Sequence, residues 1–219
     1  MELMKGVHRI PVYANCALLV DDRIILIDTS KDAAAKAILD YLPKTRLQPR
    51  DITNIIVTHC HPDHAGGLHT VKAQAPAARV AAHEADAETI GGKAYPYRPI
   101  NGPVPFKGVR VDDRLQDGQR YEGLRVIHTP GHTPGSIALL DEERSLLLAG
   151  DSFNTDPGSG PIVTNGVGPM SDDYNSDPAE HRASVKKLAA FDFEVAILGH
   201  GEAVTKGAST KVKELARRL

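Results

Sequence analysis

The sequence predicts an α/β fold, in which short strands and helices alternate along the chain. Three observations indicate this: apolar or β-branched runs bounded by turn residues, segments with apolar residues at helical spacing, and a similar order of elements in both halves. A chain of 219 residues suits one large domain or two small ones and can bury a sizeable core. Because it contains no low-complexity tract or linker, we expect a single domain over residues 1–219.

In the first half, each element follows from a local pattern. Asp21-Asp22 separates two apolar runs, which predicts a turn between two strands. Apolar residues between 32 and 42 recur at the spacing of a helix face. The β-branched run 54–57 is typical of a buried strand. The expected strands are residues 12–20, 23–27, 54–57 and 78–82, the expected helices are 32–42 and 65–74, and the Gly-, Pro- and Tyr-rich stretch 91–108 is an irregular excursion.

The second half repeats this logic. Two apolar runs flank Asp141-Glu142, which predicts a hairpin. Asp177 precedes a proline and is followed by Glu180, the pattern of a helix N-cap with an acidic first turn. The expected strands are residues 124–128, 136–140, 145–149 and 195–198, and helices are expected to begin near Asp177 and near Thr210.

Composition indicates a soluble globular protein, since 41% of the residues are hydrophobic and 25% are charged. A net charge of −2 argues against a nucleic-acid or membrane partner, so a small-molecule substrate is expected. No apolar run is long enough to span a bilayer. The two cysteines, Cys16 and Cys60, make no disulfide framework, and residues 1–9 lack a signal-peptide pattern. We therefore expect a cytoplasmic protein; the oligomeric state is not predicted.

Five of the ten histidines lie in loops that follow predicted strands, where side chains can converge over a rigid sheet. Imidazole and carboxylate suit zinc, and iron or manganese less decisively. Five histidines and two aspartates exceed the needs of one tetrahedral ion and suit two ions that share a carboxylate. The candidate ligands are His59, His61, Asp63, His64, His132, Asp151 and His200.

The remaining histidines are interpreted as structural, because a lone histidine is more often a hydrogen-bonding or surface residue than a ligand. They are His8, His69, His83, His128 and His181. Cys60 lies among the ligands, but alternation along the loop would turn its side chain away from them, so we predict that it packs in the interior.

Four segments of the chain resemble, in the right order, the motifs of the metallo-β-lactamase superfamily. They are Thr58-His59-Cys60-His61-Pro62-Asp63-His64-Ala65-Gly66-Gly67, Thr129-Pro130-Gly131-His132-Thr133-Pro134-Gly135-Ser136, Leu148-Ala149-Gly150-Asp151 and Leu198-Gly199-His200-Gly201. Asp28 matches the acidic residue of an early strand in that family. With Asp28, these matches extend from residue 28 to 201, so the resemblance covers nearly the whole chain.

The resemblance implies a four-layer αββα sandwich and two divalent metal ions, with zinc expected. His59, His61 and His132 would hold the first ion, Asp63, His64 and His200 the second, and Asp151 would bridge them, with Asp28 orienting a ligand. Two cations about 3.5 Å apart would activate a bridging water as hydroxide for attack on a carbonyl or phosphorus. Asp63 is the candidate catalytic residue, which would orient this nucleophile or return a proton to the leaving group.

The expected activity is hydrolysis of a small ester, lactone or related carbonyl compound. Secreted zinc β-lactamases usually carry a cysteine in place of Asp151, which argues against a dedicated β-lactamase. The alternatives are a hydroxyacylglutathione hydrolase-type thioesterase, an iron-dependent persulfide dioxygenase and a phosphodiesterase or nuclease; a non-enzymatic metal-binding module would need a gap in the ligand set. The candidate substrate-lining residues are Tyr95, Tyr97, Phe106, Phe153 and Tyr174.

Overall fold

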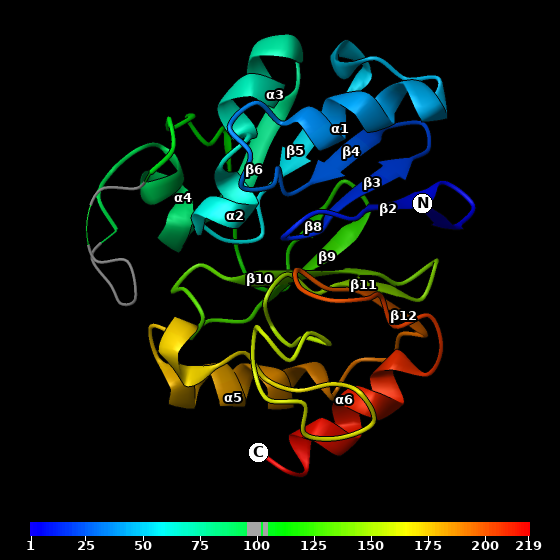
Figure 1. Ribbon diagram of the computed structural model, residues 1–219, viewed down its shortest axis with the longest axis vertical. Helices are drawn as coiled ribbons and strands as arrows, with labels where there is room; N and C mark the ends of the chain where they lie inside the picture. Colours follow the sequence, from blue (N-terminus) through cyan, green and yellow to red (C-terminus); the bar gives the residue numbers. More distant parts are fainter. Residues whose placement is uncertain (96–101, 103–104) are drawn as a thin grey trace. The chain divides into compact units, whose positions relative to one another are not determined.

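The computed structural model describes residues 1–95, 102 and 105–219 (Figure 1). The chain divides into two compact units. Of the described residues, 1–95, 102 and 105–114 form the first unit and 115–219 form the second. The single domain over residues 1–219 stays a prediction.

A seven-stranded sheet dominates the first unit, with its strands arranged in sequence order. Strands β1 to β4 are antiparallel to their neighbours, whereas β4, β5 and β6 are mutually parallel. Parallel strands end at the same edge of a sheet, so the loops that follow β4 and β5 are brought together. The strands are β1 (Glu2–Met4), β2 (Val7–Ile10), β3 (Cys16–Val20), β4 (Ile24–Ile27), β5 (Asn54–Ile56), β6 (Arg79–His83) and β7 (Asp113–Leu115).

Helices α1 and α3 lie on one face of this sheet (Figure 1). The first unit contains α1 (Lys36–Tyr41), α2 (Pro62–Ala65), α3 (Leu68–Gln74) and α4 (Glu84–Ile90), together with the 3₁₀ turns η1 (Leu42–Thr45) and η2 (Pro49–Asp51). Their apolar faces and the sheet enclose one core, which includes Leu18, Leu26, Ile38, Ile55, Leu68 and Val80.

The structure differs from the sequence-based expectation at several places in this unit. The expected helix 32–42 begins only at Lys36, after Ala35 with its positive φ of 50°, and β7 was not predicted. The expected strand 12–20 is shorter and forms β3, while the preceding β1 and β2 were not predicted. The expected helix 65–74 is two helices, α2 and α3, separated by Gly66 and Gly67. A Cβ at Gly67 would stand 2.3 Å from the Thr29 carbonyl oxygen, so the chain approaches its neighbour too closely there for any side chain. Helix α4 was also missed.

The second unit contains a five-stranded sheet in the order β12-β11-β10-β9-β8. The predicted hairpin around Asp141 is confirmed, because β10 and β11 pair antiparallel, and β11 pairs parallel with β12. The Asp177 N-cap is also confirmed, since its carboxylate accepts the N–H groups of Ala179 and Glu180. The strands are β8 (Arg120–Tyr121), β9 (Leu124–His128), β10 (Ile137–Asp141), β11 (Leu146–Leu148) and β12 (Val195–Ile197).

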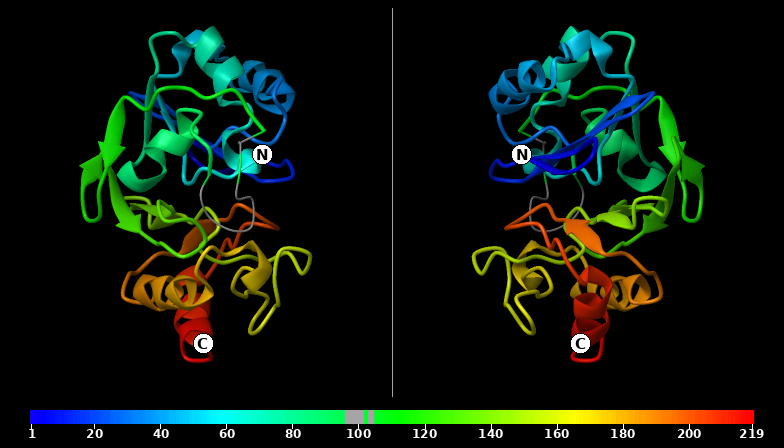
Figure 2. Two further views of the ribbon diagram at one scale, coloured as in Figure 1. Left: turned by 90° about the vertical axis from the view of Figure 1, so that its left-hand side faces the viewer. Right: turned by 90° about the vertical axis from the view of Figure 1, so that its right-hand side faces the viewer.

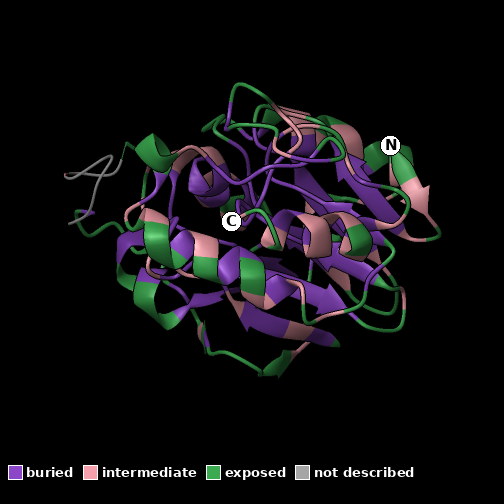
Figure 3. Cartoon of the chain, turned by 90° about the horizontal axis from the view of Figure 1, so that it is seen from below, coloured by how far each residue is buried: buried purple, intermediate pink, exposed green. Residues whose placement is uncertain are grey.

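Helices α5 (Pro178–Leu188) and α6 (Ala208–Ala216) pack against each other in this unit, and η3 (Asp172–Tyr174) is a single 3₁₀ turn (Figure 2). The helices bury one side each and expose the other, whereas the strands are mostly buried (Figure 3). The second core includes Ile127, Leu140, Leu147, Val185, Val212 and Leu215. None of the described residues belongs to a helix long and apolar enough to cross a membrane.

Candidate metal centre

In the first unit, four predicted ligands lie within residues 59–64, in the loop after β5 and the start of α2. His61 is the N-cap of α2 and Pro62 occupies its first position. Proline suits that position because its φ is already helical and it has no N–H to leave unpaired. Helical structure therefore begins at Pro62 rather than at residue 65, and it carries Asp63 and His64.

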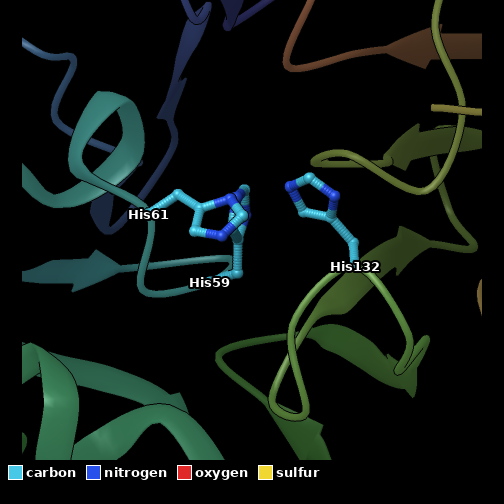
Figure 4. A group of neighbouring side chains, drawn as sticks. All are labelled: His59, His61 and His132. Atoms are coloured by element: carbon cyan, nitrogen blue, oxygen red, sulfur yellow. The ribbon is translucent and has the colours of Figure 1, made fainter. Parts of the chain in front are cut away.

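The imidazoles of this segment lie close together. The ring centroids of His59 and His61 are 4.8 Å apart, and those of His59 and His64 are 4.0 Å apart. Figure 4 shows His59 and His61 with their rings side by side. The ligand nitrogens of these two residues lie within 4.8 Å of each other. All three rings are buried, whereas Asp63 is half-buried. The expected convergence of this loop's side chains is therefore observed within the unit.

Asp28 holds His64 in place. It follows β4 and has a positive φ of 60°, which turns its carboxylate back toward the end of β5. The His64 Nδ1–H donates to its Oδ2 over 2.7 Å, and Thr58 donates to both of its oxygens, from the backbone N–H at 2.7 Å and from the hydroxyl at 2.8 Å. A proton fixed on Nδ1 makes Nε2 the metal-binding atom of His64.

Cys60 points into the interior, as predicted. Its side chain is buried in the core of the first unit. Its backbone N–H donates to Asp86 Oδ2 over 2.8 Å, which anchors the loop between two ligands. Burial, and secondarily the carboxylate of Asp86, raises the pKa of the Cys60 thiol well above its usual range. A neutral, buried thiol suits a packing role and not that of a nucleophile.

In the second unit, the three predicted ligands come from three different strand ends. His132 follows β9, Asp151 follows β11 and His200 follows β12. In the parallel pair, Leu148 is opposite Ile197, and Asp151 and His200 each lie three residues beyond these partners. The register of the sheet therefore carries both side chains to the same level past its edge.

One oxygen of Asp151 faces two imidazoles. Its Oδ2 lies 3.2 Å from His132 Nε2 and 3.3 Å from His200 Nε2, and all three side chains are buried. A carboxylate oxygen beside two Nε2 atoms can serve as a metal ligand together with them.

The loop that carries His132 is packed tightly against the start of α5. Gly131 has a φ of 113°, and a Cβ there would stand 2.0 Å from the His181 backbone nitrogen, so only glycine fits. The His132 Nδ1–H donates to Asn175 Oδ1 over 2.9 Å. Asn175 lies 43 residues from His132 and belongs to none of the motifs, so no local pattern pointed to it.

His181 has the structural role expected of it. Its ring is fully buried on α5, 6.3 Å from the ring of His132, and its Nε2 accepts the Met170 backbone N–H over 3.2 Å. Burial lowers the pKa of His181 to about 3, and the neighbouring His132 adds to this effect. His181 is therefore neutral at physiological pH.

The candidate substrate-lining residues of the first unit differ in their surroundings. Tyr95 is buried, and its ring stands edge-on to His61, with centroids 5.8 Å apart. Phe106 is half-buried and packs against the core of this unit. Tyr97 lies outside the described residues. Tyr95 therefore contacts a candidate ligand through its ring.

Two further candidates lie in the second unit. Phe153 is fully buried and belongs to its hydrophobic core, so its side chain serves packing. Tyr174 is 46% exposed at the end of η3, close in sequence to Asn175. A role of either residue in contacting substrate stays a prediction.

The donor set fits divalent metal ions. The candidate ligands are imidazoles and carboxylates, the groups that zinc, iron and manganese bind. Like the rings of His64 and His132, the ring of His59 has a hydrogen-bond partner at Nδ1, because this nitrogen lies 3.2 Å from Thr58 Oγ1. Because the Thr58 hydroxyl donates to Asp28, its oxygen is left to accept from His59. A hydrogen bond at Nδ1 that orients the ring for coordination through Nε2 is the usual second layer of a metal site.

Comparison with known proteins places these residues in a family context. Residues 9–200 match the family model of the metallo-β-lactamase superfamily. An uncharacterised protein of Bacillus subtilis, YobT, is 33% identical over 147 residues, which is 64% of this chain and 61% of that protein. A hydroxyacylglutathione hydrolase of Shewanella loihica is 29% identical over 158 residues, 72% of this chain and 50% of that protein. The chain thus spans between half and two thirds of the length of these relatives.

Solved structures show the same fold. A metallo-β-lactamase of Cronobacter sakazakii has a TM-score of 0.73 and 29% sequence identity, and the match covers 92% of this chain and 77% of that one. Together with the family match, this similarity confirms the predicted fold class, the metallo-β-lactamase fold.

Proposed function

Because this chain belongs to the metallo-β-lactamase superfamily, we propose that it is a metal-dependent hydrolase that uses two divalent ions to cleave a small ester, lactone or related carbonyl compound. The observation that carries the dinuclear site is the position of Asp151, whose Oδ2 faces His132 and His200 at nearly equal distances. A single carboxylate oxygen set between two imidazoles suits a ligand shared by two ions.

We assign His59, His61 and His132 to one ion and Asp63, His64 and His200 to the other, with Asp151 between them. Within each unit the candidate ligands lie close together: His59 and His61 in the first, and Asp151 beside His132 and His200 in the second. Zinc is the proposed metal, because histidine-rich sites with carboxylates suit it best, with iron and manganese as the other possibilities.

Two such ions, when bound, supply an activated water near neutral pH and polarise the scissile carbonyl. The chain's own residues then position and move protons. We propose that Asp63, half-buried on the first turn of α2, orients the nucleophile or returns a proton to the leaving group. Cys60 takes no part, because its thiol is buried and its raised pKa keeps it neutral.

The substrate proposal rests on charge. Residues 155–174 contain three aspartates and neither lysine nor arginine. Two cations reach this segment from the helices: Arg182 pairs with Asp172, and Lys211 donates to the Asn165 carbonyl oxygen. A segment of this charge is unfavourable for the two glycine and glutamate carboxylates of glutathione, and it favours an uncharged acyl group.

A thioesterase is the second candidate. It is favoured by the similarity to the Shewanella loihica hydroxyacylglutathione hydrolase. Because the metal chemistry is shared between oxygen and sulfur esters, the choice depends on the loops and not on the ligands. An iron-dependent persulfide dioxygenase would use similar ligands in a different reaction, and oxygen uptake distinguishes it from a hydrolase.

The test begins with metal analysis of purified protein, followed by a hydrolysis screen over lactone, thioester, β-lactam and phosphodiester substrates. We expect zinc-dependent turnover that a chelator abolishes, and a higher kcat/KM for a medium-chain lactone than for lactoylglutathione. A thioester preference of about tenfold, equal to about 1.4 kcal/mol in transition-state binding, would overturn the lactone proposal in favour of the thioesterase. Phosphodiester cleavage alone would contradict both.

A further inference from the structure

Asn175 lies behind His132 at the end of η3, and its side chain is buried. Its Oδ1 accepts the Nδ1–H of His132 over 2.9 Å. Its Nδ2 donates to the Met170 carbonyl oxygen over 3.4 Å. The amide thus joins a candidate metal ligand to the backbone of the preceding loop.

These two contacts fix which way the amide faces. If the amide were reversed, its carbonyl oxygen would face the Met170 carbonyl oxygen, and two acceptors would repel each other. With Oδ1 toward His132, the imidazole must carry its proton on Nδ1. The other nitrogen, Nε2, then has the lone pair that a metal ion requires, and it is the atom beside Asp151.

The support for Asn175 is itself anchored. The Met170 backbone N–H donates to His181 Nε2, so the residue that receives the amide of Asn175 is tied to α5. On the other side, the Ser176 N–H donates to the His132 carbonyl oxygen over 3.1 Å, and the Asp177 N–H donates to the Gly131 carbonyl oxygen over 2.8 Å. Backbone contacts therefore hold the loop of His132 against the segment that carries Asn175.

We propose that Asn175 is a positioning residue, which selects the tautomer of His132 and holds its ring ready for a metal ion. The proposal rests on the assignment of His132 as a ligand in the proposed function. It predicts a specific role for the amide oxygen, beyond the packing that any buried side chain at this position would provide.

The test compares Asn175→Leu and Asn175→Asp with the parent chain, and measures zinc affinity by chelator competition with Zn²⁺ alone. Leucine has a similar size and no acceptor, so we expect the affinity for one zinc ion to fall by about 10–100-fold. Aspartate keeps an acceptor for Nδ1–H, so we expect affinity within about threefold of the parent. The visible spectrum of the Co²⁺-loaded proteins provides a second readout: it should change in the leucine variant and stay close to the parent in the aspartate variant.

Asn154→Leu is the matched control. Asn154 is also a buried asparagine whose Nδ2 donates to loop carbonyls, those of Gly168 and Pro169, and not to a candidate ligand. We expect this change to lower the unfolding temperature while leaving zinc affinity and the Co²⁺ spectrum as in the parent.

The outcomes separate the two proposals. Parent-like zinc affinity in Asn175→Leu, or an equal loss in Asn154→Leu, would overturn the role of Asn175. If Asn175→Leu does not fold, the aspartate variant decides: retained affinity supports the role, and a loss of about tenfold or more overturns it. A parent chain that binds zinc but hydrolyses nothing would contradict the proposed function alone, whereas a parent chain that binds no zinc would overturn both.

Discussion

The two units supply their candidate metal ligands in opposite ways. The first presents four candidates within residues 59–64, where one loop and one helical turn determine their spacing. The second presents three candidates from three strand ends, and the register of β11 against β12 brings Asp151 and His200 to the same level. The first set is a local property of the chain, whereas the second exists only once the sheet has formed.

The units also differ in how they orient an imidazole. Asp28, a buried carboxylate, accepts three hydrogen bonds and holds His64. Asn175, a neutral amide, holds His132 through one. A carboxylate that accepts the Nδ1–H makes the imidazole a stronger metal ligand. Because the Asp28 carboxylate is buried, removing it also leaves its donors unpaired and lowers the free energy of unfolding. The comparison therefore predicts that the first unit depends on its supporting residue for stability as well as for metal binding.

The largest effect is expected from Asp151→Asn. The amide lacks the negative charge that offsets two dications, so we expect loss of both ions and a fall in activity of about a thousandfold or more. His200→Ala should remove one ion and leave the other. Metal content per chain, measured after dialysis, tests this, and equal metal loss in the two variants would contradict a bridging Asp151.

Asp28→Ala tests the comparison directly. Three donors lose a buried acceptor, so the free energy of unfolding should fall by about 3 kcal/mol or more. Zinc affinity should weaken by about 10–100-fold. Urea unfolding in the presence of a chelator separates the first effect from the second, with Asp28→Asn as the conservative control. A loss of stability no larger than that of Asn175→Leu would break the proposed difference between the units.

The buried imidazole of His181 should make the stability of the second unit depend on pH. Its pKa is about 3 in the folded chain, against an ordinary value of 6.5, so below pH 6.5 the unfolded chain binds a proton that the folded chain does not. Stability is therefore lost as the pH falls from 6.5 toward 3, by up to about 1.4 kcal/mol per pH unit. Urea unfolding with a chelator present should show a shallower pH dependence for His181→Gln, which keeps an acceptor for Met170. Parallel pH curves for variant and parent would contradict this assignment.

The smallest effect is expected from Cys60→Ala. The thiol is buried away from the chemistry, so activity should stay within about threefold of the parent because the metals supply the nucleophile. Stability should fall by about 1 kcal/mol through lost packing in the first core. Steady-state kinetics with metal content measured in parallel tests this. A loss of activity of about a hundredfold with both metals retained would mean that Cys60 takes part in the reaction.

Local patterns in the sequence determined much of this protein. The strand at residues 124–128, the hairpin around Asp141 and the N-cap at Asp177 depend on neighbours within a few residues, and all three appear as predicted. The segment 59–64 was recognisable for the same reason, since its four candidate ligands lie within six residues. The inward position of Cys60 also followed from alternation along the chain.

Tertiary structure decided the rest. The break between α2 and α3 coincides with the close approach of the Thr29 carbonyl oxygen to Gly67, a contact between segments far apart in the sequence. The bond between Asn175 and His132 joins residues 43 positions apart, and no local pattern encodes it. Hydrogen bonds of this kind arise only where strand register and loop packing bring two distant segments together. The sequence could therefore point to the candidate ligands, but only the fold shows which hydrogen bonds hold His59, His64 and His132 in position.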